Sequence, residues 1–187
     1  MSKQDFDLYL RSTPNSSMPN VDWKSELDFW LSQLEVLYSN VQGWLEDYIL
    51  EKQIAVSFKT DFLQEDVLGI YAVRQLAIYI KEQVIKLEPI GTYLVGTKGR
   101  VDITGPTGTV RLLLVQKDAQ SPRIVYRKRL YESADDEARD KAFFEDKGLN
   151  IEADWVWKIS TNPPHIHFFE LNQESFLDTL LRVIDGH

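Results

Sequence analysis

GRVDITGPTGTVRLLLVQK, residues 99–117, contains two runs of alternating apolar residues on either side of a turn with glycine and proline. Alternation with a period of two is the pattern of a half-buried strand, and so short a connection joins antiparallel neighbours. The stretch therefore predicts a β-hairpin with strands over 100–104 and 110–116. Strand-like runs at 90–96 and 124–130, each bounded by turn residues, extend the hairpin into an antiparallel meander.

A long amphipathic helix is predicted before the meander, with Asn20 or Asp22 as its cap. Large apolar residues recur every four or three positions as far as residue 48, which is the spacing of one helix face. Such a stripe can form a coiled-coil seam, so a homo-oligomer through residues 23–48 stays open. Because tryptophans are poor coiled-coil knobs and the stripe is wide, packing against the chain's own sheet is favoured. The stripe consists of Trp23, Leu27, Trp30, Leu34, Leu37, Val41, Trp44 and Tyr48, widened by Leu31, Tyr38 and Leu45.

A second long helix is predicted over residues 61–85, which are rich in Leu, Ile and Val on more than one side. Thr60 or Asp61 is its expected cap, and Pro89 ends it because the residue before a proline avoids the helical region. Residues 54–58, IAVSF, fit either a short strand or the connection between the two helices.

The C-terminal part is predicted to contain a charged helix over 133–147, strands over 153–160 and 165–171, and a final helix capped by Asn172. The apolar face of that final helix comprises Phe176, Leu180, Leu181 and Ile184. The predicted fold class is α+β, with a mainly antiparallel sheet of about five to six strands packed against two long N-terminal helices and a C-terminal helix.

Composition and charge limit the classes of function. The 187 residues include no cysteine and are 43% hydrophobic, which predicts one domain over 20–187 after a flexible N-terminal lead-in at 1–19. A formal net charge of -8 argues against nucleic acid as a partner, because phosphate binding depends on clustered cations. No run has the length and apolarity of a membrane span or a signal peptide, so a cytoplasmic protein is expected.

Asp102 and Lys117 raise the question of a metal-dependent nuclease. Over residues 61–160 the chain resembles the restriction-endonuclease-like nucleases, in which an Asp on one strand and a Glu-x-Lys on the next hold the metal. The resemblance implies that Asp102 binds Mg²⁺ and that Lys117 polarises the attacking water. Val115 stands where the second carboxylate is required and cannot bind a metal. The resemblance therefore leaves only an inactive relative of that fold as an alternative.

A simpler interpretation places Asp102 on the polar face of a half-buried strand. Val101 and Ile103 point to one side of the strand, and Arg100 and Asp102 point to the other. Arg111 on the next strand is then a cross-strand partner for Asp102, a contact worth about 0.2–1 kcal/mol.

Two further pairs of residues are candidates for binding. His165 and His167 project from one face of a predicted strand, but a metal site there needs a third ligand that no motif supplies. Trp155 and Trp157 share one face of the neighbouring strand. These tryptophans either pack into the core or form an exposed aromatic patch of the kind enriched at interface centres.

The sequence therefore favours a non-catalytic protein that binds another macromolecule, expected to be a protein, through an acidic, aromatic-containing surface. No nucleophile elbow, dinucleotide-binding motif or phosphate loop is present, so neither an enzyme class nor a cofactor is predicted. The alternative is a small-ligand or metal-binding domain with a pocket between sheet and helices. The polar lining of that pocket is expected to be Arg100, Asp102, Arg111, His165 and His167.

Overall fold

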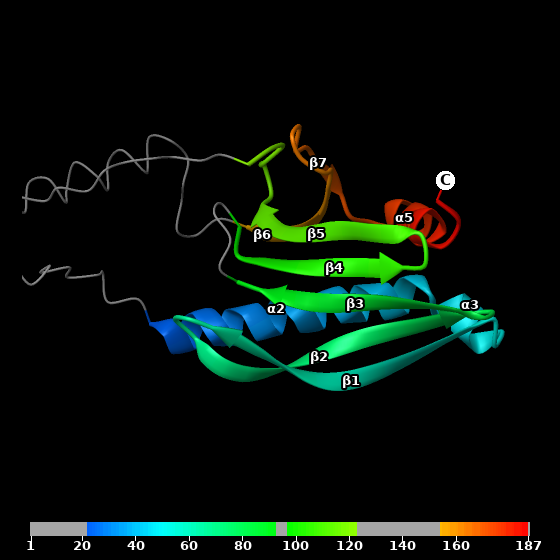
Figure 1. The fold of residues 1–187 in the computed structure, drawn as a ribbon, viewed down its shortest axis with the longest axis horizontal. Helices are drawn as coiled ribbons and strands as arrows, with labels where there is room; N and C mark the ends of the chain where they lie inside the picture. Colours follow the sequence, from blue (N-terminus) through cyan, green and yellow to red (C-terminus); the bar gives the residue numbers. More distant parts are fainter. Residues whose placement is uncertain (1–21, 93–96, 123–153, 187) are drawn as a thin grey trace, which may run out of the picture.

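A computed structural model of the chain describes residues 22–92, 97–122 and 154–186. Within these residues every strand pairs antiparallel with its neighbours in sequence, which gives one sheet of order β1-β2-β3-β4-β5-β6-β7 (Figure 1). The elements are α2 (Trp23–Trp44), α3 (Glu46–Leu50), β1 (Ile54–Glu65), β2 (Gly69–Ile80), β3 (Gln83–Gly91), β4 (Gly99–Gly105), β5 (Gly108–Gln116), β6 (Trp155–Ser160), β7 (Phe168–Glu170) and α5 (Gln173–Asp185).

The α+β class and the antiparallel sheet are confirmed, but two details of the prediction are wrong. The sheet has seven strands rather than about five to six, and one long N-terminal helix precedes it rather than two. The predicted lead-in at 1–19, the strand over 124–130 and the helix over 133–147 lie outside the described residues. Among the described helices, none combines the length and apolarity needed to cross a membrane.

Helix α2 begins where the sequence predicts. The Asp22 side chain accepts hydrogen bonds from the backbone N–H groups of Lys24 and Ser25, at 3.2 and 3.3 Å, and so caps the first turn. The middle of the apolar stripe is buried in one core with the sheet and α5, which confirms packing against the chain's own sheet. The buried residues of α2 are Trp30, Leu34, Leu37, Tyr38 and Val41.

The helix predicted over 61–85 is wrong, because this segment forms the end of β1, all of β2 and the start of β3. Turns at Gly69 (φ 72°) and Lys81 (φ 53°) reverse the chain between the strands. In β2 the buried positions change phase, from Tyr71 and Val73 to Leu76 and Ile78. Val73 and Leu76 are three residues apart, which is also the spacing of neighbours on one face of a helix. The buried residues of β2 therefore resemble those of a helix with apolar residues on more than one side.

The phase change follows from the shape of the β1–β2 hairpin. β3 pairs with β2 only from Leu76 to Ile80, so in the sheet residues 69–75 of β2 have β1 as their one neighbouring strand. A two-stranded ribbon twists more strongly than a wide sheet, and Figure 1 shows β1 and β2 twisting about each other. One face of the ribbon therefore packs against the core at Tyr71 and Val73, and the opposite face does so at Leu76 and Ile78.

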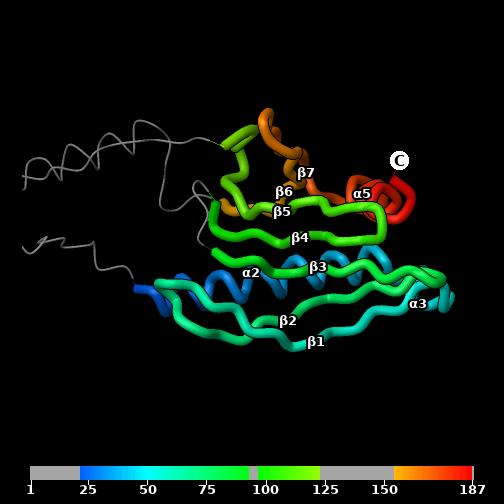
Figure 2. Tube along the Cα trace, in the orientation of Figure 1, coloured from blue at the N-terminus to red at the C-terminus, as the bar shows by residue number. Residues whose placement is uncertain are grey.

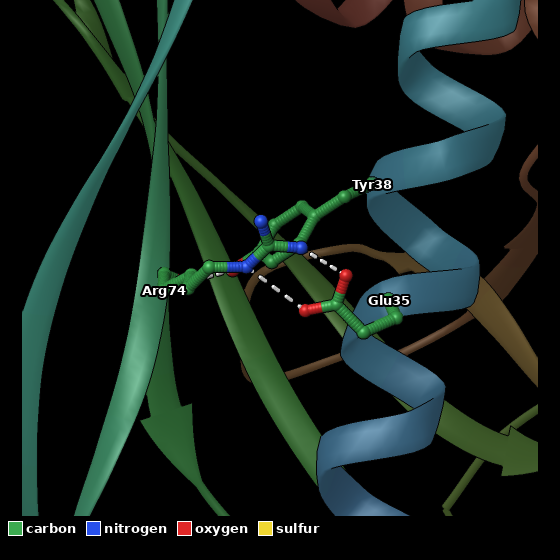
Figure 3. A network of polar contacts seen from close by, with 3 residues as sticks. All are labelled: Glu35, Tyr38 and Arg74. Carbon is green, nitrogen blue, oxygen red and sulfur yellow. Dashed lines mark hydrogen bonds and ion pairs between the residues drawn. The ribbon is translucent and has the colours of Figure 1, made fainter.

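Arg74 lies at this phase change and joins the ribbon to α2 (Figure 3). Its guanidinium binds both carboxylate oxygens of Glu35, with Nε 3.0 Å from Oε1, and stands 4.4 Å from the centre of the Phe58 ring. The Tyr38 hydroxyl donates to the Arg74 carbonyl oxygen. Because both ion-pair partners are about half exposed, the pair contributes only about 0–1 kcal/mol. The network mainly sets the position of α2 along β2.

Of the C-terminal elements that fall within the described residues, the strand predicted to end at 160 and the final helix are confirmed. Helix α5 is capped by Asn172, whose side chain accepts from the Ser175 N–H at 3.0 Å while Ser175 Oγ accepts from the Asn172 N–H at 3.0 Å. The strand predicted over 165–171 is shorter, since β7 spans only three residues before the chain turns into α5 (Figure 2). Leu181, which the sequence predicts on the apolar face, is 56% exposed, so this part of the prediction is wrong. The buried face of α5 is Phe176, Thr179, Leu180 and Val183.

Candidate functional site

A cleft of about 540 Å³ lies between α2 and the start of β6. Val36 and Asn40 of α2 form one wall, and Trp155 and Trp157 of β6 form the other. The cleft exists because β7 pairs with β6 only at Lys158–Ser160. Within the described chain, the first half of β6 therefore has a strand partner on the β5 side alone.

The backbone of that half of β6 points toward the cleft. On the β5 side, the Lys117 N–H donates to the Asp154 carbonyl oxygen at 2.9 Å. Backbone groups of successive residues in an antiparallel strand point to opposite sides, so those of Trp155 and Trp157 point away from β5. The cleft thus presents two N–H and two C=O groups along an open strand edge.

The indole rings beside this edge are held in place. The Trp157 side chain is buried, and its ring centre lies 5.9 Å from that of Trp30. The Trp157 indole N–H donates to the Gln33 carbonyl oxygen at 3.0 Å. The Lys98 ammonium lies 5.7 Å from the centre of the Trp155 ring. Trp157 is a core residue, whereas Trp155 is half-buried and offers its ring to the cleft.

Charged groups of both signs surround the cleft. The Lys158 ammonium donates to the carbonyl oxygens of Lys117 and Ala119, at 2.6 and 2.8 Å, which ties the turn after β5 to β6. Asp118 and Glu170 bring carboxylates to the same lining. The rim is therefore polar, while Trp155 and Val36 provide apolar surface inside it. Val36 lies off the buried stripe of α2 and is 48% exposed.

Arg100, Asp102 and Arg111 lie elsewhere, on the sheet face opposite the helices. The register pairs Asp102 with Arg111 across β4 and β5, but the ion pair of Asp102 is formed with Arg100 of its own strand. Two hydrogen bonds join them, Nε to Oδ1 and Nη2 to Oδ2, both at 2.6 Å. Asp102 is only 8% exposed, so these bonds satisfy a carboxylate that is largely removed from water.

The register also separates the two residues on which the nuclease resemblance depends. Asp102 is opposite Arg111, and Lys117 follows Arg111 by six residues, which is about 20 Å along a strand. That distance is too great for both side chains to serve one metal. In the described part of the chain, no group of three or more His, Asp and Glu side chains is placed to hold a metal ion.

His165 and His167 lie on the connection between β6 and β7, not on a strand as predicted. Thr161 organises this connection: its hydroxyl donates to the His165 carbonyl oxygen at 2.7 Å and accepts from the His167 N–H at 2.8 Å. Both imidazoles are exposed and neither lines the cleft. Of the seven predicted site residues, Trp155 and Trp157 line this cleft together and the other five do not.

Comparison with family models, with curated proteins and with solved structures finds no match to this chain.

Proposed function

We propose that this protein binds an extended segment of another protein, which adds to the open edge of β6 as a further strand. The observation that carries the proposal is the Trp155–Trp157 edge, which among the described strands pairs with β5 alone and lies beside a cleft walled by α2. Main-chain hydrogen bonds to such an edge provide affinity, and pockets for alternate side chains provide specificity. No catalytic step is proposed.

The dimensions of the cleft favour a short segment. Three residues of β6 extend over about 10 Å, so a bound strand would pair with about three or four residues of the partner. Side chains two positions apart on that strand would enter between Trp155 and Val36. Tryptophan is enriched at the energetic centres of protein interfaces, and the surrounding charges would form the polar rim.

The charge of the chain favours a basic segment. The formal net charge is -8, whereas the lining of the cleft is balanced, with Asp118 and Glu170 beside Lys117 and Lys158, so the attraction comes from the chain as a whole. An acidic surface attracts a basic partner during diffusional encounter and raises the association rate, an effect that salt reduces.

The test is selection of peptides from a displayed random library against the full chain, followed by amide hydrogen exchange of the complex. Strand addition should protect the backbone N–H groups of Trp155 and Trp157. Val36→Glu should weaken binding by about tenfold or more, because it places a carboxylate in the apolar part of the cleft. Val84→Glu is the matched control, since Val84 is 42% exposed on β3, away from the cleft. Binding that leaves both amides unprotected, or that Val84→Glu weakens equally, would refute the proposal.

A small ligand is the second candidate, because the volume of the cleft lies within the range of about 300–1,000 Å³ of small-molecule sites. A ligand that binds only the folded state raises the melting temperature. A dye-monitored melt with a panel of aromatic and charged metabolites therefore distinguishes a small ligand from a peptide segment. A shift that Val36→Glu abolishes, without protection of the two amides, would favour this candidate.

A further inference from the structure

The strand at the other edge of the sheet is β1, which pairs on one side only among the strands of the described residues. Its twelve residues pair with β2 without interruption, from Ile54 with Ile80 to Glu65 with Gly69. Within the described chain no strand pairs with the opposite side of β1. The strand contains neither proline nor glycine, and an edge of this length without such breaks is suited to pairing with another strand.

The hairpin between β2 and β3 shows which residues of β1 offer their backbone groups. Ile80 pairs with Gln83 across a two-residue turn, and the residues that close such a turn exchange hydrogen bonds. Even-numbered residues of β2 therefore bond to β3 and odd-numbered ones to β1. The register then directs the N–H and C=O groups of Phe58, Thr60 and Phe62 away from β2, and the Phe62 N–H donates there to the Asp61 carboxylate at 2.8 Å, a bond that strand pairing would replace.

We propose that two copies of this chain pair through β1, antiparallel, about a two-fold axis at Thr60. In this register Lys59 of each copy lies opposite Asp61 of the other, which gives two ion pairs by symmetry. Phe58 of each copy lies opposite Phe62 of the other. Such a closed, self-complementary contact produces a dimer with one continuous sheet, and it does not propagate into a fibre.

Charge selects this register over its neighbours. A two-fold axis at Lys59 would place the two Lys59 side chains opposite each other, and an axis at Asp61 would do the same with the two Asp61 side chains. Like charges directly opposite in a sheet are destabilising, whereas opposite charges are favourable. An axis at Thr60 lies between these two and places each Lys59 opposite an Asp61, so both contacts are attractive.

Phe62 gives the contact an apolar component. This side chain is 67% exposed, although it lies on the same side of β1 as Phe58 and Thr60. Thr60 lines an open groove of about 450 Å³ between α2 and the ribbon, together with Leu31 and Val73. In the proposed dimer the Phe62 ring of one copy stands beside Phe58 and this groove of the other, and so loses its exposure to water.

The test is sedimentation equilibrium of the full chain across a range of concentrations. Wild type should show a monomer–dimer equilibrium. Lys59→Asp and Asp61→Lys should each raise the dissociation constant by about tenfold or more, because each creates two like-charge contacts. The double variant Lys59→Asp with Asp61→Lys should restore dimerisation, because the charges are again complementary.

The apolar component is tested separately. Phe62→Ser should also weaken the dimer, whereas Ile70→Ser should not, although Ile70 is 71% exposed on the neighbouring strand of the same ribbon. Circular dichroism melts establish that each variant is folded. A wild-type chain that stays monomeric throughout, or a double charge swap that stays as weak as the single ones, would overturn the proposal. The outcome does not depend on peptide binding at β6.

Discussion

The Trp30 ring lies directly on the backbone of Gly99, at the start of β4. A Cβ atom added at Gly99 would stand 2.0 Å from Cζ3 of that ring. Trp30 is completely buried and also contacts Trp157, so it has no room to retreat. This contact explains why β4 must begin with glycine.

Gly99→Ala should destabilise the protein by about 1–3 kcal/mol, since an oversized group in a packed core forces neighbouring side chains and backbone to shift. Gly108→Ala is the control, because a Cβ at Gly108 meets nothing within 4 Å and its φ is negative or extended. Urea unfolding of both variants measures the difference. Equal stabilities would mean that the Trp30 ring is not seated on β4.

Stability should fall as the pH rises above about 10. Burial raises the pKa of the Tyr38 phenol above its usual value, and the Glu35 carboxylate raises it further. Burial also raises the pKa of Tyr71, whose hydroxyl donates to Glu65. Both phenols stay protonated in the folded state when they ionise in the unfolded chain near pH 10, so rising pH favours unfolding.

Each tyrosine should contribute up to about 1.4 kcal/mol of lost stability per pH unit in that interval. Urea titrations at pH 9, 10 and 11 measure the slope. Tyr38→Phe and Tyr71→Phe should each flatten it, whereas Tyr48→Phe, at an exposed position, should leave it unchanged. A slope that neither buried-site variant alters would contradict the assignment.

Arg100→Gln should cost about 1–3 kcal/mol, because it leaves the Asp102 carboxylate largely buried without its two charge-assisted hydrogen bonds. Arg111→Gln should cost less than about 0.5 kcal/mol, since Arg111 is opposite Asp102 but does not form its ion pair. Thermal unfolding of the two variants compares them. The reverse order of stabilities would show that the cross-strand pair dominates in solution.

Leu180→Ala and Leu181→Ala should differ sharply, although the residues are adjacent in α5. Leu180 is 3% exposed and its truncation should cost about 2–5 kcal/mol, because a cavity remains in the core. Leu181 is 56% exposed and its truncation should cost less than about 0.5 kcal/mol. Denaturant midpoints report both values, and similar losses would mean that α5 is rotated about its axis.

The sequence predicts the fold best where one periodicity persists through an element. In the Trp30 to Val41 stripe and in β4 and β5, the residues of the main core hold a single phase, so element type and core face are predicted correctly. Asp102 and Val115 are also buried, but on the other face of the sheet. The same reasoning gives a wrong prediction for β2, because the buried face of this strand changes between Val73 and Leu76. The cause is the twist of a ribbon that extends past β3, which is a property of strand lengths and not of local spacing.

The cleft is only half predictable for a similar reason. Trp155 and Trp157 are visible in the sequence as an aromatic pair on one strand. Val36 and Asn40 fall off the apolar stripe of α2 and resemble ordinary surface positions. Their role depends on β7 ending after three residues, which uncovers the edge of β6, and no local pattern before Asn172 shows that the strand is so short.

The uninterrupted meander has a consequence for how the chain folds. From β1 to β5 each strand pairs with the next one along the chain across a short connection, so these hairpins can form locally before distant segments meet. The bond from Trp157 to Gln33 joins residues 124 positions apart. Docking of β6 against α2 therefore closes a long loop, and this contact is expected to form after the β1–β5 hairpins.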